Sequence, residues 1–243
     1  MRTWLLKNSW ATDGDYYAKE SGSLIRAESN YNSKLFFNWA KGEKWGWTDG
    51  FICGVIGNIW QECQWNPWLW ESGRVGDMEA GFGLVQWTPA SKYIDWAEEQ
   101  GLDYKSIWSQ FARIKYEYEN GLQWNKDYKS VWNTAAPEQY RATNKLNWQY
   151  WATIYRPYNP EAANWELNWL NDCTACFMDC YERPAEETAN LEYRRQRAAE
   201  AYGGLVVQDP GFDWPVADGN AGSVYQIIPI GENQKRKRRR IVL

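Results

Sequence analysis

The sequence contains no histidine among its 243 residues. This absence excludes the Ser-His and Cys-His nucleophile pairs, together with every metal site that depends on an imidazole ligand. Most peptidase and amidase chemistries are excluded with them. The possibilities left are carboxylate chemistry, a metal site built from cysteines alone, or no chemistry.

Cysteine is scarce, and its count of five is odd. Cys53 and Cys63 lie ten residues apart on one expected helix, about 15 Å along its axis, which is too far for a disulfide. Cys173, Cys176 and Cys180 share one helical face, but a thiolate metal site there would need a fourth ligand from elsewhere. We therefore expect buried reduced thiols, no metal and no cofactor.

Long apolar runs are also missing, and none reaches the length that spans a membrane. The opening MRTWLL is too short for the apolar core of a signal peptide, so we expect cytoplasmic synthesis without one and no transmembrane segment. The net charge is −4, and the run KRKRRR at 235–240 contributes six positive charges, so the remainder carries −4 − 6 = −10. An acidic body argues against a specific nucleic-acid partner. The basic run indicates either attraction to an anionic surface or a solvated end.

Aromatic residues are abundant instead, with 19 Trp, 16 Tyr and 7 Phe. So many tryptophans exceed what a core of this size needs. Planar side chains in an open groove can stack on sugar rings or bases, or can anchor a protein partner. Packing alone remains the alternative for most of them.

The hydrophobic pattern predicts one mainly helical domain over residues 26–204. It follows an N-terminal extension (1–25) and precedes an irregular C-terminal arm (205–243) that is rich in Pro and Gly. Thr48 is expected to cap a helix that ends near the sequence NIWQEC, and Thr88-Pro89 resembles a second helix start. The alternating stretch GFGLVQW at 81–87 predicts a short strand beside a glycine turn.

Glu62 occupies an unexpected position on the helix that follows Thr48. On a helical wheel it falls between Phe51 and Val55, at the edge of the apolar arc, with Asn58 one turn earlier beside it. Apolar neighbours and the C-terminal end of a helix both disfavour the ionised carboxylate. A carboxyl group that stays protonated near neutral pH is what a general acid requires. A Glu that reaches solvent or pairs with a nearby Arg is the alternative.

Several motifs occur in order along residues 26–203: WGWTDG at the helix start, NIWQECxxNP, GFGLVQWTP, and YERP leading to an Arg-rich helix. Together they resemble the phage tail lysozyme family, within the wider lysozyme-like and lytic transglycosylase group. The resemblance implies a mainly α, α+β lysozyme-like fold with one small β-hairpin lining a glycan cleft. It also implies that Glu62 is the general acid that protonates the glycosidic oxygen.

A second carboxylate could act as a base about 6.5–9.5 Å from the acid, as in inverting glycosidases. The loop before the predicted strand offers Asp77 and Glu79, with Glu71 upstream, and Glu79 is favoured because it lies nearer the strand. Lytic transglycosylases need only one Glu, so both mechanisms stay open. Glu182 of the YERP motif is expected to form an ion pair with an Arg of the following helix.

Substrate contacts are expected from Gln86, Trp87, Thr88, Asn58 and Phe82. Gln86 can offer both a donor and an acceptor to an N-acetyl group or a hydroxyl. Thr88 has an alternative role as a helix cap, and Phe82 stands where the family usually has Tyr. Gly81 and Gly83 would let a sugar approach the backbone closely.

The sequence therefore predicts a phage enzyme that cleaves the β-1,4 glycan of peptidoglycan, carried in the virion tail and bound to other tail proteins through its C-terminal arm. The alternatives are a lytic transglycosylase that gives 1,6-anhydro products, a non-catalytic glycan-binding virion protein, and a chitin-cleaving enzyme with the same acid.

Overall fold

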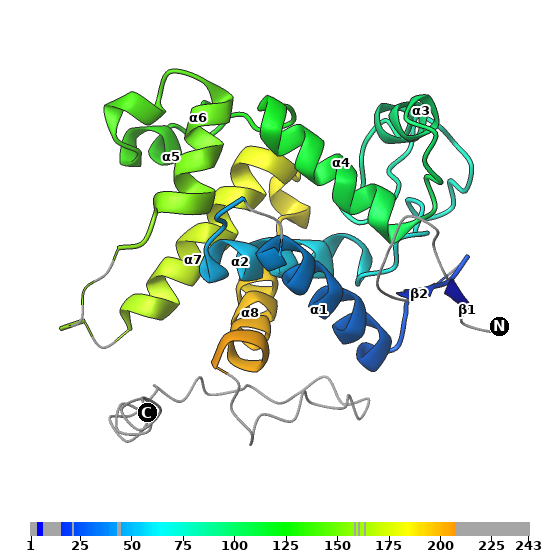
Figure 1. The fold of residues 1–243 in the computed structure, drawn as a ribbon, viewed down its shortest axis with the longest axis horizontal. Coiled ribbons are helices and arrows are strands. Elements are labelled where there is room, and N and C mark those ends of the chain that lie inside the picture. The colour runs from blue at the N-terminus through cyan, green and yellow to red at the C-terminus, as the bar shows by residue number, and fades with distance from the viewer. Residues whose placement is uncertain are drawn as a thin grey trace.

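The computed structural model of this chain describes residues 4–6, 16–20, 22–42, 45–157, 159, 161–162 and 164–207. Within them the chain is mainly helical, which confirms the predicted fold class (Figure 1). The α-helices are α1 (Arg26–Gly42), α2 (Asp49–Cys63), α3 (Ser91–Glu99), α4 (Ile107–Asn120), α5 (Ser130–Ala135), α6 (Asn144–Gln149), α7 (Trp165–Phe177) and α8 (Leu191–Tyr202). Shorter 3-10 or π segments are η1 (Glu138–Tyr140), η2 (Tyr150–Ile154), η3 (Met178–Glu182), η4 (Glu186–Thr188) and η5 (Gly203–Val207). The predicted arm beyond residue 207, with the run KRKRRR, lies outside the described residues, as does most of the predicted extension 1–25.

Helix α2 lies at the centre of the helical assembly, between α7, α8 and α1 (Figure 1). Thr48 caps it as predicted, because its hydroxyl accepts the N–H of Phe51 at 3.3 Å. Gln64 ends it in the left-handed conformation (φ 51°), with its N–H donated to the carbonyl of Trp60. Every residue from Gly50 to Trp60 is buried, because a helix that is apolar on all sides is stable only inside a core.

Two glycines of α2 let its neighbours approach to backbone contact. A Cβ at Gly57 would overlap the carbonyl oxygen of Arg194 and lie 2.8 Å from the amide nitrogen of Ala198, both on α8. A Cβ at Gly54 would lie 3.0 Å from the amide nitrogen of Thr174 on α7. The glycines therefore set how closely α7 and α8 pack against α2, and Gly57 brings the Arg194 backbone against α2 at the residue before Asn58.

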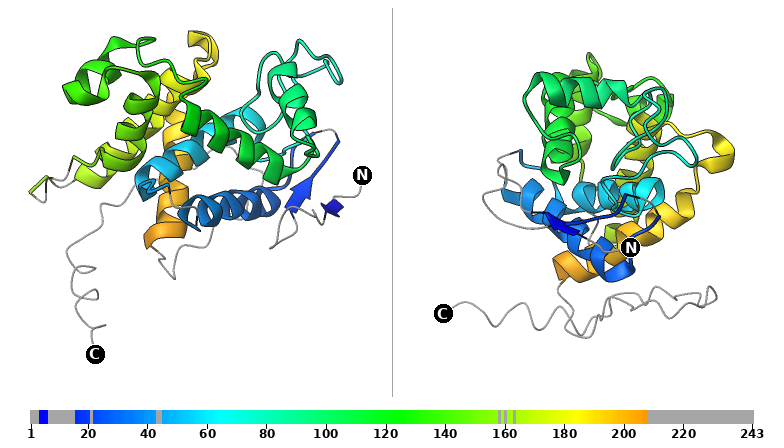
Figure 2. Two further views of the ribbon diagram at one scale, coloured as in Figure 1. Left: turned by 45° about the horizontal axis from the view of Figure 1, so that its top comes forward. Right: turned by 90° about the vertical axis from the view of Figure 1, so that its right-hand side faces the viewer.

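The lobe around α3 and the small α5 lie towards opposite ends of the long axis, as Figures 1 and 2 both show. In the α3 lobe, the predicted strand at 81–87 is wrong. Phe82 forms isolated bridges with Trp70 and Trp87, and positive φ angles at Gly83 (83°) and Gln86 (47°) fold the segment into a tight loop. A strand cannot continue through left-handed residues. The regular strands are β1 (Trp4–Leu6) and β2 (Tyr16–Ala18), which pair antiparallel.

The predicted helix start at Thr88-Pro89 is also wrong by a few residues, since α3 begins at Ser91 after Ala90. The Thr88 hydroxyl donates instead to the carbonyl of Gln86 at 2.9 Å. Helix α4 begins at Ile107, where the Ser106 hydroxyl accepts the N–H of Trp108. Local turn contacts therefore decide these helix starts.

Much of the aromatic content packs the interior. Five tryptophans are among the largest fully buried side chains: Trp65, Trp124, Trp148, Trp151 and Trp169. Trp124 and Trp148 stack with their ring centroids 5.0 Å apart. The packing alternative for the aromatics is therefore correct for these residues.

All five cysteines are free and buried, as expected. Burial raises the pKa of the Cys63 thiol, so this thiol is held in its unreactive neutral form. Among the described residues no helix is long and apolar enough to cross a membrane, and no group of three or more acidic or cysteine side chains is arranged to hold a metal ion.

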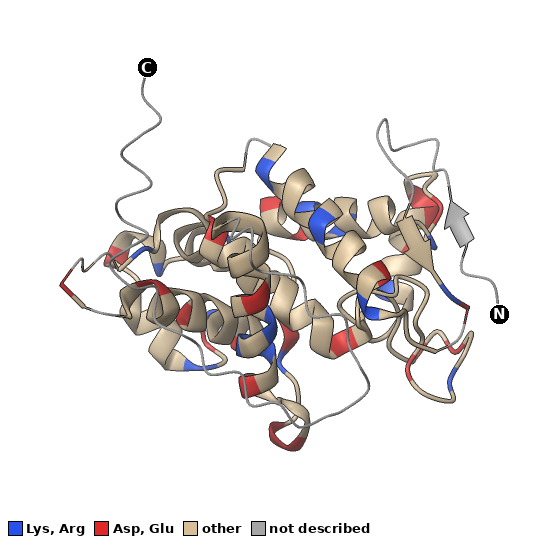
Figure 3. Cartoon of the chain, turned by 90° about the horizontal axis from the view of Figure 1, so that it is seen from below, with Lys and Arg blue, Asp and Glu red and all other residues tan. Residues whose placement is uncertain are grey.

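Acidic and basic residues are interspersed over the described part of the face drawn in Figure 3. Several form ion pairs between elements. Arg26 of α1 binds Glu200 of α8 at 2.6 Å, and Lys41 binds Asp49 at 2.8 Å. Figure 3 therefore shows charges of both signs on this face, and the two ion pairs link α1 to α8 and α1 to α2.

Candidate active site

Glu62 stands in the last turn of α2, one residue before the helix ends at Cys63. Its side chain is 18% exposed, so it is accessible from solvent although it sits at the end of a buried helix. One carboxylate oxygen, Oε1, accepts a hydrogen bond from Nη2 of Arg194 at 2.6 Å. Glu62 therefore has a polar neighbour in addition to the apolar ones that we expected. The alternative, in which Glu62 pairs with a nearby Arg, is confirmed.

Arg194 of α8 is 1% exposed and is held on all sides. Its Nη1 donates to Oδ1 of Asn58 at 2.9 Å, and its Nε donates to the carbonyl of Ala189 at 2.7 Å. A buried guanidinium needs a counter-charge and hydrogen-bond acceptors, and Glu62 supplies the charge. The orientation of Glu62 is thus fixed by a side chain that cannot itself move freely.

Asn58 lies one turn before Glu62 and is fully buried. Its Nδ2 donates to the carbonyls of Gly54 (2.8 Å) and Thr174 (3.0 Å), which leaves Oδ1 for Arg194. All of its described contacts are within the protein. Its predicted contact with a substrate is not tested. The hydrogen bonds show that Asn58 holds the guanidinium of Arg194.

Glu182 does not form the ion pair expected for it with an Arg of the following helix, because Arg194 binds Glu62 instead. Oε1 of Glu182 is buried without a hydrogen-bond partner in the described part of the chain. Burial, first, and the charge of Glu62, second, raise the pKa of Glu182 well above its ordinary value, against the opposing effect of Arg194. A carboxyl group in this setting is stable in its protonated form.

The loop before residue 81 holds the carboxylates that were considered as a second catalytic group. Arg74 binds Asp77 at 2.8 Å and Glu71 at 3.1 Å. Asp77 also accepts the N–H of Glu79, and this bond, followed by Arg74, lowers the pKa of Asp77. Glu79 is exposed. No contact described in the structure joins these groups to Glu62, so their predicted role is not tested.

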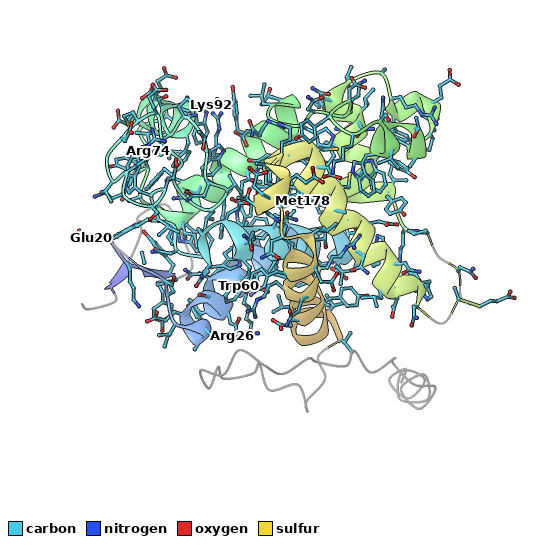
Figure 4. The ribbon with its side chains drawn as sticks, turned by 180° about the vertical axis from the view of Figure 1, so that it is seen from behind. Glu20, Arg26, Trp60, Arg74, Lys92 and Met178 are labelled. Carbon is cyan, nitrogen blue, oxygen red and sulfur yellow. The ribbon has the colours of Figure 1, made fainter. Side chains whose placement is uncertain are left out.

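Figure 4 shows Arg74 and Lys92 together in the α3 lobe, whereas Trp60 lies on α2 beside α8. Arg74 therefore lies in the α3 lobe, apart from Trp60 on α2. Trp60 is contacted by Arg197, whose guanidinium carbon lies 4.9 Å from the ring centroid.

The segment 81–88 is held together by the amide of Gln86. Its Nε2 donates to the carbonyls of Leu69 (3.0 Å) and Gly83 (2.9 Å), so its donors are used inside the loop. No described residue donates to Oε1, which lies 2.9 Å from the position that a Cβ on Gly81 would take. Gln86 was predicted to offer a ligand both a donor and an acceptor. These contacts leave only the acceptor, Oε1, available.

Trp87 and Phe82 are 2% and 1% exposed, so their rings face the interior. Trp87 stacks on Tyr93 with a centroid separation of 4.5 Å and donates its Nε1–H to Glu117 at 3.1 Å. Phe82 packs against Trp70. The predicted contacts of these two rings with a sugar are not tested, and burial disfavours them. Thr88 is exposed and remains available.

Glu117 and Arg194 are two buried charged residues that the sequence analysis missed. Glu117 of α4 is 1% exposed, pairs with Arg113 at 2.8 Å and accepts the hydroxyl of Tyr181. Burial is the main cause that raises the pKa of Glu117. Both residues stand on the buried faces of their helices, so the argument that selected Glu62, a charge among apolar positions, could have found them.

Two comparisons bear on the chain as a whole. A model of the phage tail lysozyme family matches residues 31–205. The protein named Morphogenesis protein 1 of Bacillus phage B103 is 39% identical over 109 residues, which cover 45% of this chain and 29% of that protein. The chain therefore spans less than a third of the length of this relative.

Proposed function

The chain belongs to the phage tail lysozyme family, and on that premise we propose that it cleaves the β-1,4 glycan backbone of bacterial peptidoglycan with Glu62 as the general acid. The observation that supports this assignment is the setting of Glu62. Its carboxyl group is partly exposed at the end of a buried helix, and a buried guanidinium holds one of its two oxygens. No described residue donates a hydrogen bond to the second oxygen, and we propose that this oxygen faces the substrate.

In this mechanism, protonated Glu62 donates its proton to the oxygen that joins two sugars. The bond from that oxygen to the anomeric carbon then breaks, and positive charge develops on the sugar ring. The contact with Arg194 restricts the rotation of the carboxyl group, so the proton is presented in one direction. Asn58 maintains that geometry from behind by holding Arg194.

Two chemical outcomes are compatible with one acid. In hydrolysis a base activates water, and Glu79 could fill this role, because it is the carboxylate of the 71–80 loop that forms no ion pair with a described residue. In lytic transglycosylation the 6-hydroxyl of the sugar attacks the anomeric carbon and gives its proton to the Glu62 carboxylate, and no water enters. Asp77 and Glu71 form ion pairs with Arg74, which leaves fewer carboxylates that could act as a base. This favours lytic transglycosylation as the second candidate.

We place the protein in the phage virion, at the tail, where it would open the host cell wall. The family and the phage relative support this placement. Other tail proteins are its proposed partners, bound through the C-terminal arm, and peptidoglycan glycan strands are its substrate.

The test is digestion of purified peptidoglycan by the wild type, Glu62→Gln and the exposed surface control Glu98→Gln, with the released saccharides weighed by mass spectrometry. We expect products from the wild type and the control but not from Glu62→Gln. A product that has gained one water identifies hydrolysis, and a 1,6-anhydro end identifies transglycosylation. Glycan binding without products from any variant would refute the catalytic proposal. Chitin oligomers assayed in parallel separate a chitinase from a peptidoglycan enzyme.

A further inference from the structure

Gln110 of α4 is a fully buried amide that binds the main chain of two other segments. Its Oε1 accepts the backbone N–H of Leu84 at 2.8 Å, and its Nε2 donates to the backbone carbonyl of Pro67 at 2.7 Å. Burial of an amide is unfavourable unless its polar atoms are hydrogen-bonded, and here both the oxygen and the nitrogen have partners. Gln110 therefore joins two parts of the chain that are not neighbours in the sequence.

The first of these parts follows the end of α2 that carries Glu62. Helix α2 ends at Cys63, whose carbonyl accepts the N–H of Asn66 at 3.0 Å, and Pro67 is the next residue. The second part also meets this helix end, because the Cys63 thiol lies 3.4 Å from the carbonyl oxygen of Leu84. The two hydrogen bonds of Gln110 therefore help to fix Leu84 beside the last turn of α2.

The second part is the segment 81–88, which has an inner and an outer side. Its residues are buried except for Gln86 and Thr88, the two that can present polar groups to a ligand. Gln110 supports the inner side at close range, since a Cβ on Gly83 would lie 2.8 Å from Oε1 of Gln110. The positions of the outer groups therefore depend on the contacts that hold the inner side.

Helix α4 holds the same segment at a second place. Trp87 donates its Nε1–H to Oε1 of Glu117 at 3.1 Å. Glu117 follows Gln110 by seven residues, about two helical turns, so both side chains lie on one face of α4. Two buried polar groups of one helix thus hold the residues on either side of Gln86.

We propose that Gln110 is a positioning residue for substrate binding, which holds the segment 81–88 beside the end of α2 so that Gln86 and Thr88 meet the glycan strand next to Glu62. The inference rests on the proposed function and extends it to a buried residue that does not touch the substrate. The acid has a separate support, because Glu62 is bound by Arg194 of α8. Loss of the bonds of Gln110 should therefore loosen the binding segment and leave the acid in place.

The substitution that tests this role is Gln110→Met, which removes both hydrogen bonds and keeps the length of the side chain. It leaves the N–H of Leu84 buried without an acceptor, which favours opening of the segment. The matched control is Asn147→Leu, because Asn147 is a fully buried amide of α6 that accepts Nε1–H of Trp124 at 3.0 Å. Both variants lose a buried amide, but only Gln110→Met acts on the segment 81–88.

The first experiment does not depend on catalysis. Amide hydrogen exchange of the full chain is followed by mass spectrometry for the wild type and both variants. We expect amides of the segment 81–88 to exchange about 10-fold faster in Gln110→Met, as the loss of hydrogen bonds predicts, and at the wild-type rate in Asn147→Leu. The amides of α8 report global unfolding. Unchanged exchange at 81–88, or an equal acceleration at α8, overturns the inference.

The second experiment measures cleavage of solubilised peptidoglycan glycan strands at 25 °C, with the folded fraction of each variant checked by circular dichroism. We expect KM to rise about 10-fold in Gln110→Met with kcat retained, because binding is weakened while the acid stays in place. Asn147→Leu should keep the wild-type KM. A fall in kcat at unchanged KM would indicate a merely structural role, and unchanged kinetics would remove any role; both overturn the inference.

An inactive wild type would refute the proposed function instead. Calorimetric binding of the same glycan strands to Glu62→Gln and to Glu62→Gln/Gln110→Met then tests the inference without cleavage. We expect the double variant to bind about 10-fold more weakly. Equal affinities of the two proteins overturn the positioning role of Gln110.

Discussion

Replacing Arg194 with Met would remove the buried guanidinium that binds Glu62 while keeping most of the apolar stem of the side chain. The change leaves Oδ1 of Asn58 buried without its donor and leaves Glu62, whose side chain is 18% exposed, without its cation. An unsatisfied buried acceptor costs about 1–3 kcal/mol. Removal of one member of a buried ion pair costs about 3–5 kcal/mol in total. We expect a loss of that size in the free energy of unfolding.

The assay is urea unfolding followed by circular dichroism, with the slope compared between variants to confirm that the unfolded state is unchanged. Arg195→Met is the control, since Arg195 is the next residue of α8 and its Nε has no hydrogen-bond partner among the described residues. Glu62→Gln and the double variant Arg194→Met/Glu62→Gln complete a double-mutant cycle. If the pair carries the cost, the double variant loses less than the sum of the single variants. Additive losses within about 0.5 kcal/mol, or a loss for Arg194→Met no larger than the control, would refute the reasoning.

Three further predictions follow from the packing and titration of the core. Gly57→Ala should lower the free energy of unfolding by about 1–3 kcal/mol or more, because the added methyl group overlaps α8. Gly42→Ala is the control and should not lower it, because there is open space around Gly42. Equal effects of the two substitutions in urea unfolding would contradict the close approach of α8 to Gly57. The pKa of Glu182 is raised in the folded state, so above about pH 4.3 the folded state binds more protons than the unfolded state. The free energy of unfolding of the wild type should therefore fall, relative to that of Glu182→Gln, as pH rises from there towards the folded-state pKa. Parallel curves of stability against pH for the two proteins would exclude this. The five buried thiols should react with a thiol reagent only after denaturation, and rapid labelling of the native chain would show that burial is incomplete.

The sequence was sufficient for those features that local chemistry decides. The apolar arc that includes Phe51 and Val55 predicted α2, and the side chain of Thr48 identified where that helix begins. Both succeed because an apolar stripe and a cap act within a few residues of chain. The same is true of the buried thiols and of the position of Glu62 at the end of an apolar helix.

Other features depend on contacts between distant parts of the chain. Arg194 and Glu62 are 132 residues apart, and nothing local to either residue names the other. The exchange of partners at Glu182 has the same cause, because two carboxyl groups compete for one Arg and the fold decides between them. The alternation of GFGLVQW indicated a strand, but Gln110 of α4 accepts the N–H of Leu84 at 2.8 Å and so fixes a turn that the pattern does not contain.

The contact at Gly57 also restricts how the protein can move. Main chain meets main chain there, so α8 cannot slide along α2 unless the two helices first separate. Shear between them is therefore blocked, and the register of Arg194 against Glu62 is set by the two backbones. A substrate would therefore meet an acid whose orientation is set by the packing of two helix backbones as well as by the contact with Arg194.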